Sequence, residues 1–358
     1  MMNVSENIKN ITPYVPGKPI EELERELGIN GSIKLASNEN PLGPSPKAIT
    51  AIKKAVEGLN RYPDGSGFYL SQALARKYGV DISQIVLGNG SNELIELLVR
   101  TFVQPGDEVV SADPSFVVYR MITEAASGVN VVVPCKDMRH DLDAMAERIT
   151  ARTKIVFIAN PNNPTGTMNT GAEMKRFMGR VPDHAIVAID EAYFEYVTHA
   201  DYPDSLDYLK ENKNVVALRT FSKIYGLAGL RMGYGITTTE IAELMNKVRQ
   251  PFNTNSLGQI GALAALADRK HVDKSVAVNN EGKQFLYHAF QRLGISYIPT
   301  ETNFIMFETG LDGREVYNAL LKAGVIIRPM GGNRLRVTIG LPEENARFTA
   351  ELEKIVKA

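Results

Sequence analysis

The chain has 358 residues, of which 44% are hydrophobic, and its 40 Lys and Arg nearly balance its 41 Asp and Glu to leave a net charge of -1. This length fits about two domains with a large core, and the composition excludes a disordered or fibrous protein. Because the charge is balanced, no broad basic field is present to neutralise a phosphate backbone. We therefore expect a small-molecule ligand and no nucleic acid.

The single cysteine, Cys135, excludes an intrachain disulfide framework and a cysteine-based metal cluster, which is typical of proteins from a reducing compartment. The five histidines are scattered without metal-ligand spacing, so no metal site is predicted. The first residues lack the basic start and apolar core of a signal peptide, and no apolar run approaches the ~20 residues that span a bilayer. We expect a cytoplasmic protein without a membrane partner.

In chain order, residues 1–35 are predicted to form a polar N-terminal arm with a short charged helix around Glu21 to Leu27. Residues 36–255 are predicted to form a large domain, because short apolar runs alternate there with segments of helical period. Such runs are typical of strands buried on both faces of a mostly parallel sheet with helices on each side. The runs are Ile85–Leu87, Glu108–Val110, Val129–Val133, Ile155–Ile158, Ala185–Ile189 and Val215–Leu218.

Residues 256–358 are predicted to form a smaller α+β C-terminal domain, near which the N-terminal segment packs. It begins with a helix of small residues from Ile260 to Ala267. Its predicted strands are Tyr297–Ile298, Asn303–Phe307, Val325–Ile327 and Leu335–Ile339.

Ligands of open α/β sheets bind at the carboxyl ends of the strands, so the residues that follow each apolar run indicate function. Asp190 ends one run, and a carboxylate there is costly unless it meets a cation or a hydrogen-bond donor. ATPases also end a strand in Asp-Glu, but the sequence contains no Gly-x-x-x-x-Gly-Lys-Ser/Thr phosphate loop. The ATPase interpretation is therefore excluded.

Lys223 follows another run and is flanked by hydroxyls and glycines. A lysine at the end of an interior strand can be desolvated enough to act as an amine nucleophile toward an aldehyde. Taken alone, an ordinary solvated lysine is the more common interpretation.

Two loops add to these residues. The segment 160–167 holds two X-Pro bonds and a glycine, which stiffen it and place Asn side chains at the ligand edge of the sheet. The segment Gly88–Glu93 precedes a helix predicted from Leu94 to Phe102, and such glycines expose backbone N–H groups to an anion, commonly a phosphate. Glu93 breaks the dinucleotide-binding fingerprint.

In this order and spacing, the four segments resemble the fold-type I aminotransferases that depend on pyridoxal 5′-phosphate, and the resemblance runs along essentially the whole chain. Thr12–Tyr14, Leu35–Pro44 and Arg61–Asp64 resemble the subgroup that moves an amino group between L-histidinol phosphate and 2-oxoglutarate in histidine biosynthesis. The resemblance implies an α/β large domain with a mostly parallel seven-stranded sheet, and a homodimer with shared active sites.

The resemblance also implies roles for individual residues. Lys223 would bind the cofactor aldehyde covalently and, once displaced by substrate, move the proton between Cα and C4′. Asp190 would keep the pyridine nitrogen protonated. Asn163 and Tyr193 would hydrogen-bond the 3′-oxygen of the ring. Lys223, Asp190 and Tyr193 are thus the expected catalytic residues.

A second group of residues is expected around the cofactor, where Phe116 would stack on the ring although many relatives have tyrosine there. Tyr62 would reach the cofactor phosphate from the neighbouring subunit. The same phosphate would be held by Ser91, Asn92, Thr220, Ser222 and Arg231.

For the substrate, Arg336 is expected to bind an acidic group, because its guanidinium fork matches carboxylate and phosphate alike. Arg328 and Tyr14 would complete a pocket for the substrate phosphate, with Tyr14 supplied by the other subunit. Asn40 is also expected among the substrate-binding residues.

Three alternatives stay open. Aromatic amino-acid aminotransferases share nearly all these motifs, and a decarboxylase similar to threonine-phosphate decarboxylase would differ only in substrate pose. A non-catalytic cofactor-binding module would be expected to lose Lys223 and to carry a DNA-binding segment, and this sequence keeps the lysine and has no such segment.

Overall fold

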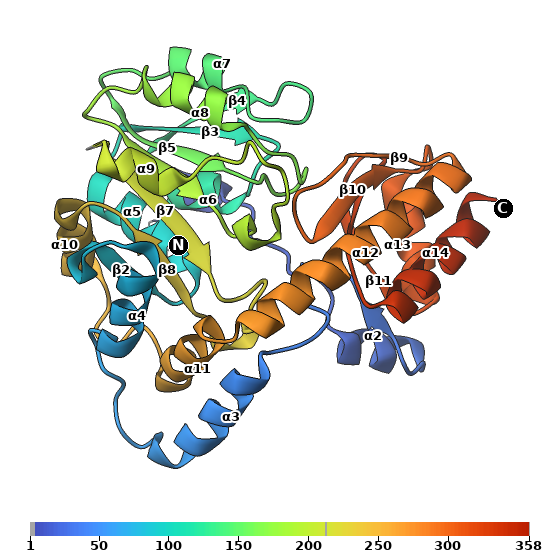
Figure 1. Ribbon diagram of the computed structural model, residues 1–358. Coiled ribbons are helices and arrows are strands. Elements are labelled where there is room, and N and C mark those ends of the chain that lie inside the picture. The colour runs from blue at the N-terminus through green and yellow to red at the C-terminus, as the bar shows by residue number, and fades with distance from the viewer. Residues whose placement is uncertain (1–3, 212, 358) are drawn as a thin grey trace.

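Seven strands form the central sheet of the larger part of the molecule in the computed structural model, which describes residues 4–211 and 213–357 (Figure 1). The strand order is β2-β8-β7-β6-β5-β3-β4, and only the pairings of β8 are antiparallel. The predicted mostly parallel seven-stranded sheet is thus confirmed. The strands are β2 (Ile85–Gly88), β3 (Glu108–Asp113), β4 (Val129–Pro134), β5 (Thr153–Ala159), β6 (Ile186–Asp190), β7 (Val215–Thr220) and β8 (Gly233–Ile236).

Both faces of this sheet are buried because helices cover each of them, and successive side chains of each strand point alternately to the two faces. On one face, Ile155 and Phe157 of β5 pack with α5 (Ser91–Phe102), α6 (Val118–Ala125) and α10 (Thr239–Val248). On the other face, Val156 and Ile158 pack with α7 (Leu142–Glu147) and α8 (Gly171–Met178). The apolar runs of the sequence are explained by this double burial.

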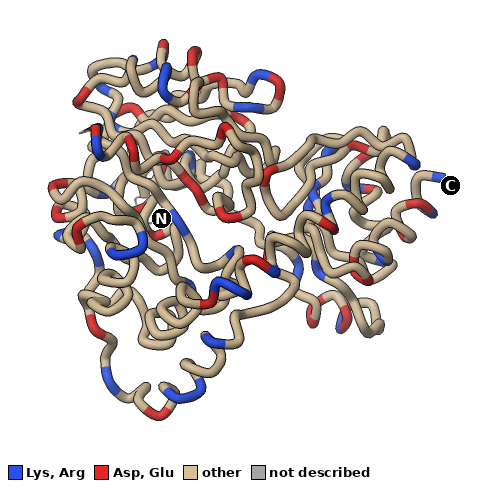
Figure 2. Tube along the Cα trace, viewed as in Figure 1, with Lys and Arg blue, Asp and Glu red and all other residues tan. Residues whose placement is uncertain are grey.

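The same second face is completed by helices that cover β2, β7 and β8. They are α3 (Pro46–Ala55), α4 (Phe68–Tyr78), α9 (Ser205–Lys210) and α11 (Ser256–Leu266). The short α1 (Glu6–Asn10) lies against α6, on the side of the first face. Lysines, arginines, aspartates and glutamates are mixed over the trace in Figure 2, as the balanced composition predicts. No helix in the described part of the chain is long and apolar enough to cross a membrane.

A second, antiparallel sheet builds the C-terminal part, which is reached through the long helix α12 (Arg269–Leu293) (Figure 1). Its strand order is β12-β13-β10-β9, and α13 (Gly313–Lys322) and α14 (Pro342–Val356) share its core. The strands are β9 (Ser296–Tyr297), β10 (Phe304–Glu308), β12 (Arg328–Gly331) and β13 (Arg334–Thr338).

The N-terminal segment joins this C-terminal part. Strand β1 (Ile33–Lys34) pairs in parallel with β11 (Val325–Ile326), and Leu23 of α2 (Ile20–Leu27) packs on Ile326. The division of the chain at residues 35 and 255 stays a prediction.

Candidate active site

One cavity lies where the carboxyl ends of the large sheet meet the C-terminal sheet. It is lined by all the residues that the sequence singled out except Tyr62 and Asn40. Those that line it are Tyr14, Ser91, Asn92, Phe116, Asn163, Asp190, Tyr193, Thr220, Ser222, Lys223, Arg231, Arg328 and Arg336. Segments more than 300 residues apart in the chain, at positions 14 and 336, therefore share one site.

Lys223 occupies the turn that follows β7 and reaches into the cavity. Its Nζ donates a hydrogen bond to the backbone oxygen of Ser37 at 3.2 Å and lies 5.6 Å from the ring centre of Tyr193. Burial lowers the pKa of this amine to about 8, and the positive charges of Arg336 and Arg231 act in the same direction. A lysine with such a pKa has a substantial neutral, nucleophilic fraction near neutral pH.

Asp190 ends β6 and is 7% exposed. Its Oδ2 accepts a hydrogen bond from the Tyr119 hydroxyl at 2.7 Å, and its Oδ1 accepts one from the backbone N–H of Ala192 at 3.2 Å. Burial raises the pKa of Asp190, while these two donors oppose the rise. A cationic ligand atom beside this carboxyl group would favour its ionised form.

Tyr193 lies three residues beyond Asp190, on the same side of the cavity. Its hydroxyl accepts a hydrogen bond from Asn38 Nδ2 at 2.9 Å, and its ring meets Phe304 edge-on at 5.2 Å. Burial raises the pKa of Tyr193 to about 12 even though Arg336 acts against the rise. The phenol is therefore protonated at neutral pH and can donate a hydrogen bond to an oxygen of a ligand.

Hydrogen-bond donors surround the start of α5 and form a small pocket, which we call the phosphate cup. Gly90, at φ +79°, is the residue before the helix, and a Cβ atom there would lie 2.4 Å from Nη2 of Arg231. Arg231 Nη1 donates to Ser222 Oγ at 3.3 Å, and the backbone N–H of Ser222 donates to Thr220 Oγ1 at 3.0 Å. A helix N-terminus together with hydroxyl and guanidinium donors forms an anion subsite of the size of a phosphate.

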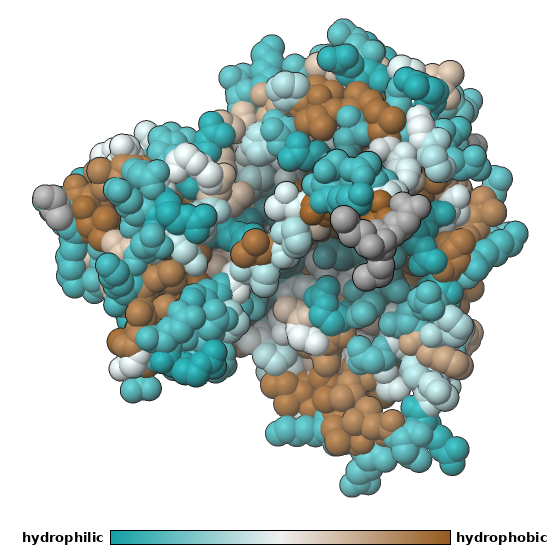
Figure 3. Space-filling view, turned by 180° about the vertical axis from the view of Figure 1, so that it is seen from behind, coloured by the Kyte–Doolittle hydropathy of each residue, from teal (hydrophilic) through white to brown (hydrophobic). Residues whose placement is uncertain are grey.

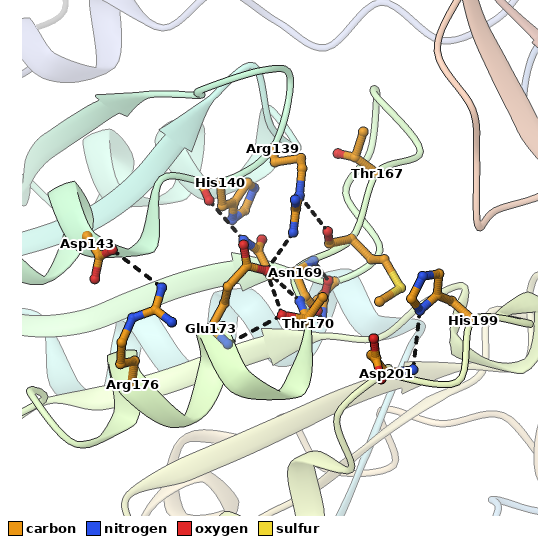
Figure 4. A network of polar contacts seen from close by, with 12 residues as sticks. Arg139, His140, Asp143, Thr167, Asn169, Thr170, Glu173, Arg176, His199 and Asp201 are labelled. Carbon is orange, nitrogen blue, oxygen red and sulfur yellow. Dashed lines mark hydrogen bonds and ion pairs between the residues drawn. The ribbon is translucent and has the colours of Figure 1, made fainter.

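The loop 160–167 is held in place from behind by the polar network of Figure 4. Asn160 and Asn169 exchange two hydrogen bonds, and Asn169 Nδ2 also donates to the backbone oxygen of His140 at 2.9 Å. Thr170 and Glu173 form the capping box that starts α8 immediately after the loop. These contacts fix the backbone from which Asn163 faces the cavity.

A second group of cationic side chains faces the cavity from the C-terminal sheet. Arg328 and Arg336 are directly opposite each other in the β12–β13 ladder. Arg336 is 8% exposed, and it donates from Nη1 to Asn163 Oδ1 and from Nη2 to the backbone oxygen of Ala36 at 3.0 Å. Its Nε is buried and has no hydrogen-bond partner among residues 4–211 and 213–357.

Like charges in register repel each other, and burial lowers the pKa of Arg336. The ring of Tyr14 lies 5.3 Å from the Arg328 guanidinium. Two arginines that repel each other, one with a free donor, define a second anion subsite on this side of the cavity.

Two expected residues lie elsewhere in the chain. Tyr62 is 82% exposed and stacks on Phe252 at 4.7 Å, so it does not reach the cavity of its own chain. Asn40 is buried, and its Nδ2 donates to the Ile224 backbone oxygen at 2.7 Å and to Ser275 Oγ at 2.9 Å. Tyr14 lines the cavity of its own chain, whereas the resemblance suggested that it comes from another subunit.

Several lining residues were not singled out from the sequence, among them Ser37, Asn38, Ser115, Tyr119 and Met330. The φ angle of +56° at Asn38 is a conformation that asparagine tolerates better than most residues, which is the one local signal for it. Tyr119 carries no local signal, because its helix position is typical of a core residue.

The donor set fits pyridoxal 5′-phosphate. Lys223 could bind an aldehyde, Asp190 a protonated ring nitrogen, Tyr193 a phenolic oxygen, and the cup beside Gly90 a phosphate group. The described residues contain no group of three or more His, Cys, Asp or Glu side chains arranged to hold a metal ion.

The sheet and this cavity define the class of fold-type I pyridoxal-phosphate transferases. Residues 30–351 match the model of the family described as aminotransferase class I and II, and the chain belongs to this family.

Two relatives are similar along nearly their whole length. The histidinol-phosphate aminotransferase of Moorella thermoacetica is 51% identical over 356 residues, which cover 98% of this chain and 92% of that protein. Histidinol-phosphate aminotransferase 1 of Nitrosococcus oceani is 48% identical over 354 residues, which cover 98% of this chain and 96% of that protein. The solved structure of histidinol-phosphate aminotransferase from Sinorhizobium meliloti in complex with pyridoxal-5′-phosphate superposes with a TM-score of 0.92 at 28% identity, covering 100% of this chain and 98% of that one.

Proposed function

We propose that this pyridoxal-phosphate-dependent aminotransferase moves the amino group of L-histidinol phosphate to 2-oxoglutarate, giving imidazole-acetol phosphate and L-glutamate in histidine biosynthesis. The observation that carries the proposal is the pair Arg328 and Arg336, in register beside the cavity of Lys223. A phosphate or carboxylate is the ligand that such a pair needs. The names of the full-length relatives point to the same substrate.

The cofactor, when bound, supplies an aldehyde for Lys223 and a ring that accepts electrons from the substrate Cα. Lys223 would hold the cofactor through its aldehyde and, when freed by substrate, would be the base that moves a proton between Cα and C4′. Asp190 holds the proton on the ring nitrogen. Tyr193 and Asn163 hydrogen-bond the 3′-oxygen, and Phe116 stacks on the ring. The cofactor phosphate is held by Ser91, Asn92, Thr220, Ser222 and Arg231.

Substrate recognition falls to the opposite side of the cavity. Arg336 and Arg328 bind the phosphate of histidinol phosphate in one half-reaction and a carboxylate of 2-oxoglutarate in the other, since both anions match a guanidinium. Tyr14 closes this subsite over Arg328. Asn40 acts on the substrate side only indirectly, because it bonds the backbone oxygen of Ile224, the residue after Lys223, and Ser275 Oγ on α12.

The functional form is a homodimer, and its cellular location is the cytoplasm. Exposed apolar side chains gather on the α3 and α4 side, and Figure 3 shows brown groups in this lower part of the molecule. The exposed side chains in and between these elements are Leu59, Tyr62, Phe68 and Tyr69, of which Tyr62 is 82% exposed. A second copy would cover them and place its own Tyr62 at the cofactor phosphate.

A steady-state comparison of amino donors with 2-oxoglutarate tests the substrate. We expect kcat/KM for histidinol phosphate to exceed that for phenylalanine by a large factor, because the single carboxylate of phenylalanine cannot satisfy both the buried Arg336 and the half-buried Arg328. Equal use of both donors would favour the aromatic aminotransferase, and release of carbon dioxide from threonine phosphate would favour the decarboxylase. The structure of L-threonine-O-3-phosphate decarboxylase from Porphyromonas gingivalis, 21% identical at a TM-score of 0.81, shares the fold alone.

A further inference from the structure

Among the described residues of the cavity wall, Tyr119 is the one whose side chain is bonded directly to Asp190. It lies on α6 and is 1% exposed. Its ring stacks on Phe157 with 4.5 Å between centres and 3° between planes, and Phe116 meets it edge-on at 5.6 Å. This packing fixes the ring, so the hydroxyl remains 2.7 Å from Asp190 Oδ2.

The direction of this hydrogen bond is determined by the surroundings. Burial raises the pKa of Tyr119 well above its usual value, and the charge of Asp190 acts in the same direction. The phenol is therefore protonated and donates to the carboxylate. Within the described residues no other side chain donates to Asp190, whose second oxygen receives only the longer bond from Ala192 at 3.2 Å.

Asp190 needs such a donor because its surroundings otherwise favour the neutral acid. Burial and the neighbouring Glu191 both raise the pKa of Asp190, and the Tyr119 hydroxyl is the strongest group that lowers it. A neutral carboxylic acid could still form a hydrogen bond with the ring nitrogen. It carries no negative charge, however, so it could not stabilise the protonated, cationic form of that nitrogen.

We propose that Tyr119 is a positioning residue that keeps Asp190 ionised and oriented toward the cofactor. Asp190 can then keep the ring nitrogen of the bound cofactor protonated. The inference rests on the proposed function only through pyridoxal 5′-phosphate and does not depend on the amino donor. Because Phe116 contacts the Tyr119 ring, the aromatic group expected to stack on the cofactor and the group that controls its nitrogen belong to one packed unit.

The test removes the hydroxyl and keeps the ring, in Tyr119→Phe. Tyr78→Phe is the matched control, because the Tyr78 hydroxyl is bonded to Tyr234 at 2.7 Å and does not line the cavity. The first measurement is the Kd of the cofactor-free protein for pyridoxal phosphate, followed by absorbance. We expect Tyr119→Phe to bind about tenfold more weakly, the change that corresponds to the loss of about 1.4 kcal/mol, and Tyr78→Phe to bind like the parent.

The second measurement is the pH titration of the visible absorption of the lysine-bound cofactor. Without the hydroxyl, the proton shifts from the ring nitrogen toward Asp190, and the ring withdraws less electron density from the nitrogen of Lys223. That nitrogen becomes more basic, so we expect its apparent pKa to rise by about half a unit in Tyr119→Phe. An unchanged titration curve would overturn the proposal.

A cofactor analogue in which carbon replaces the ring nitrogen separates positioning from packing. With deazapyridoxal phosphate, Tyr119→Phe and the parent protein should bind almost equally, because Asp190 has no nitrogen to act on. Equal weakening with both cofactors would show a purely structural role and refute the inference. If Tyr119→Phe does not fold, fluorotyrosine at position 119, a stronger donor, should lower the apparent pKa instead. Failure of the parent protein to bind pyridoxal phosphate would contradict the proposed function and not this inference alone.

Discussion

Replacing Arg328 by glutamine removes one of the two guanidinium groups that face each other across the β12–β13 ladder. The substitution keeps a side chain of similar length, and Arg336 keeps its bonds to Asn163 and Ala36. If the pair exists to bind the substrate phosphate, the loss of Arg328 must weaken that interaction. It must also relieve the repulsion within the ladder.

Removing one partner of a buried pair of opposite charges, here Arg328 and the substrate phosphate, costs about 2–5 kcal/mol. Because Arg328 is only half-buried, we take about 2–3 kcal/mol. This corresponds to about a 30- to 150-fold fall in kcat/KM for histidinol phosphate. The folded protein, in contrast, is expected to become more stable when Arg328 is replaced. Directly opposed like charges cost up to about 1 kcal/mol, so the Tm of the cofactor-free protein should rise by about 1–2 °C.

The assay compares kcat/KM for histidinol phosphate and phenylalanine, with Arg314→Gln as the control, because Arg314 is exposed on α13 and does not line the cavity. Phenylalanine offers only a singly charged carboxylate, which Arg336 can still bind in Arg328→Gln, so its kcat/KM should fall much less than that for histidinol phosphate. An equal fall for both donors, or a fall in Tm together with activity, would refute a role in phosphate recognition and indicate a structural arginine.

Three further predictions concern the cofactor side of the cavity. Lys223→Ala should bind pyridoxal phosphate without a covalent bond and lose transamination by at least ~1,000-fold, with no borohydride label at position 223; near-normal turnover would remove this lysine from the chemistry. Because the pKa of Lys223 in the folded chain is about 8, against an ordinary 10.5, the unfolded chain binds more protons between these values. The free energy of unfolding of the cofactor-free protein, measured relative to Lys223→Met, should therefore rise with pH across this range, and a flat difference would show an unperturbed amine. Gly90→Ala should push the Arg231 guanidinium out of the phosphate cup, since the added Cβ would lie 2.4 Å from Nη2, and weaken cofactor binding by more than about tenfold in a fluorescence titration. Unchanged affinity would show that the cup tolerates a side chain.

The strands that the sequence predicts are those whose residue pattern follows directly from burial. Strands β5, β6 and β7 are continuous apolar runs because both of their faces are buried. Strand β8 was missed, since its sequence Gly-Tyr-Gly-Ile holds two glycines. A Cβ at Gly233 would lie 2.5 Å from the backbone nitrogen of Ser91, so this glycine lets the start of α5 approach the sheet. Strand β12 was also missed, because Pro329 and Gly331 lie within it and its register shifts there.

The residues of the site also divide into those that the sequence predicts and those that it does not. Residues on strand ends or in stiff loops, such as Asp190 and Asn163, were predicted because the position of the strand determines where they lie. In the segment after the arm, the resemblance indicated Asn40, but Asn38 reaches the cavity. Asn38 adopts a left-handed backbone conformation, which an asparagine tolerates but does not require, so its residue type alone does not predict that it reaches the cavity. Tyr119 was missed because its role depends on a contact across 71 residues of chain.

The pairing of β1 with β11 has a consequence for how the chain folds during synthesis. Ile33 and Lys34 leave the ribosome long before the strand they pair with, Val325–Ile326, has been made. The larger sheet, complete by Ile236, can therefore assemble while these residues still wait for their partner. A fragment that starts at residue 256 would lack β1 altogether, so the C-terminal part should depend on residues 33–34, far upstream in the same polypeptide, to pair with β11.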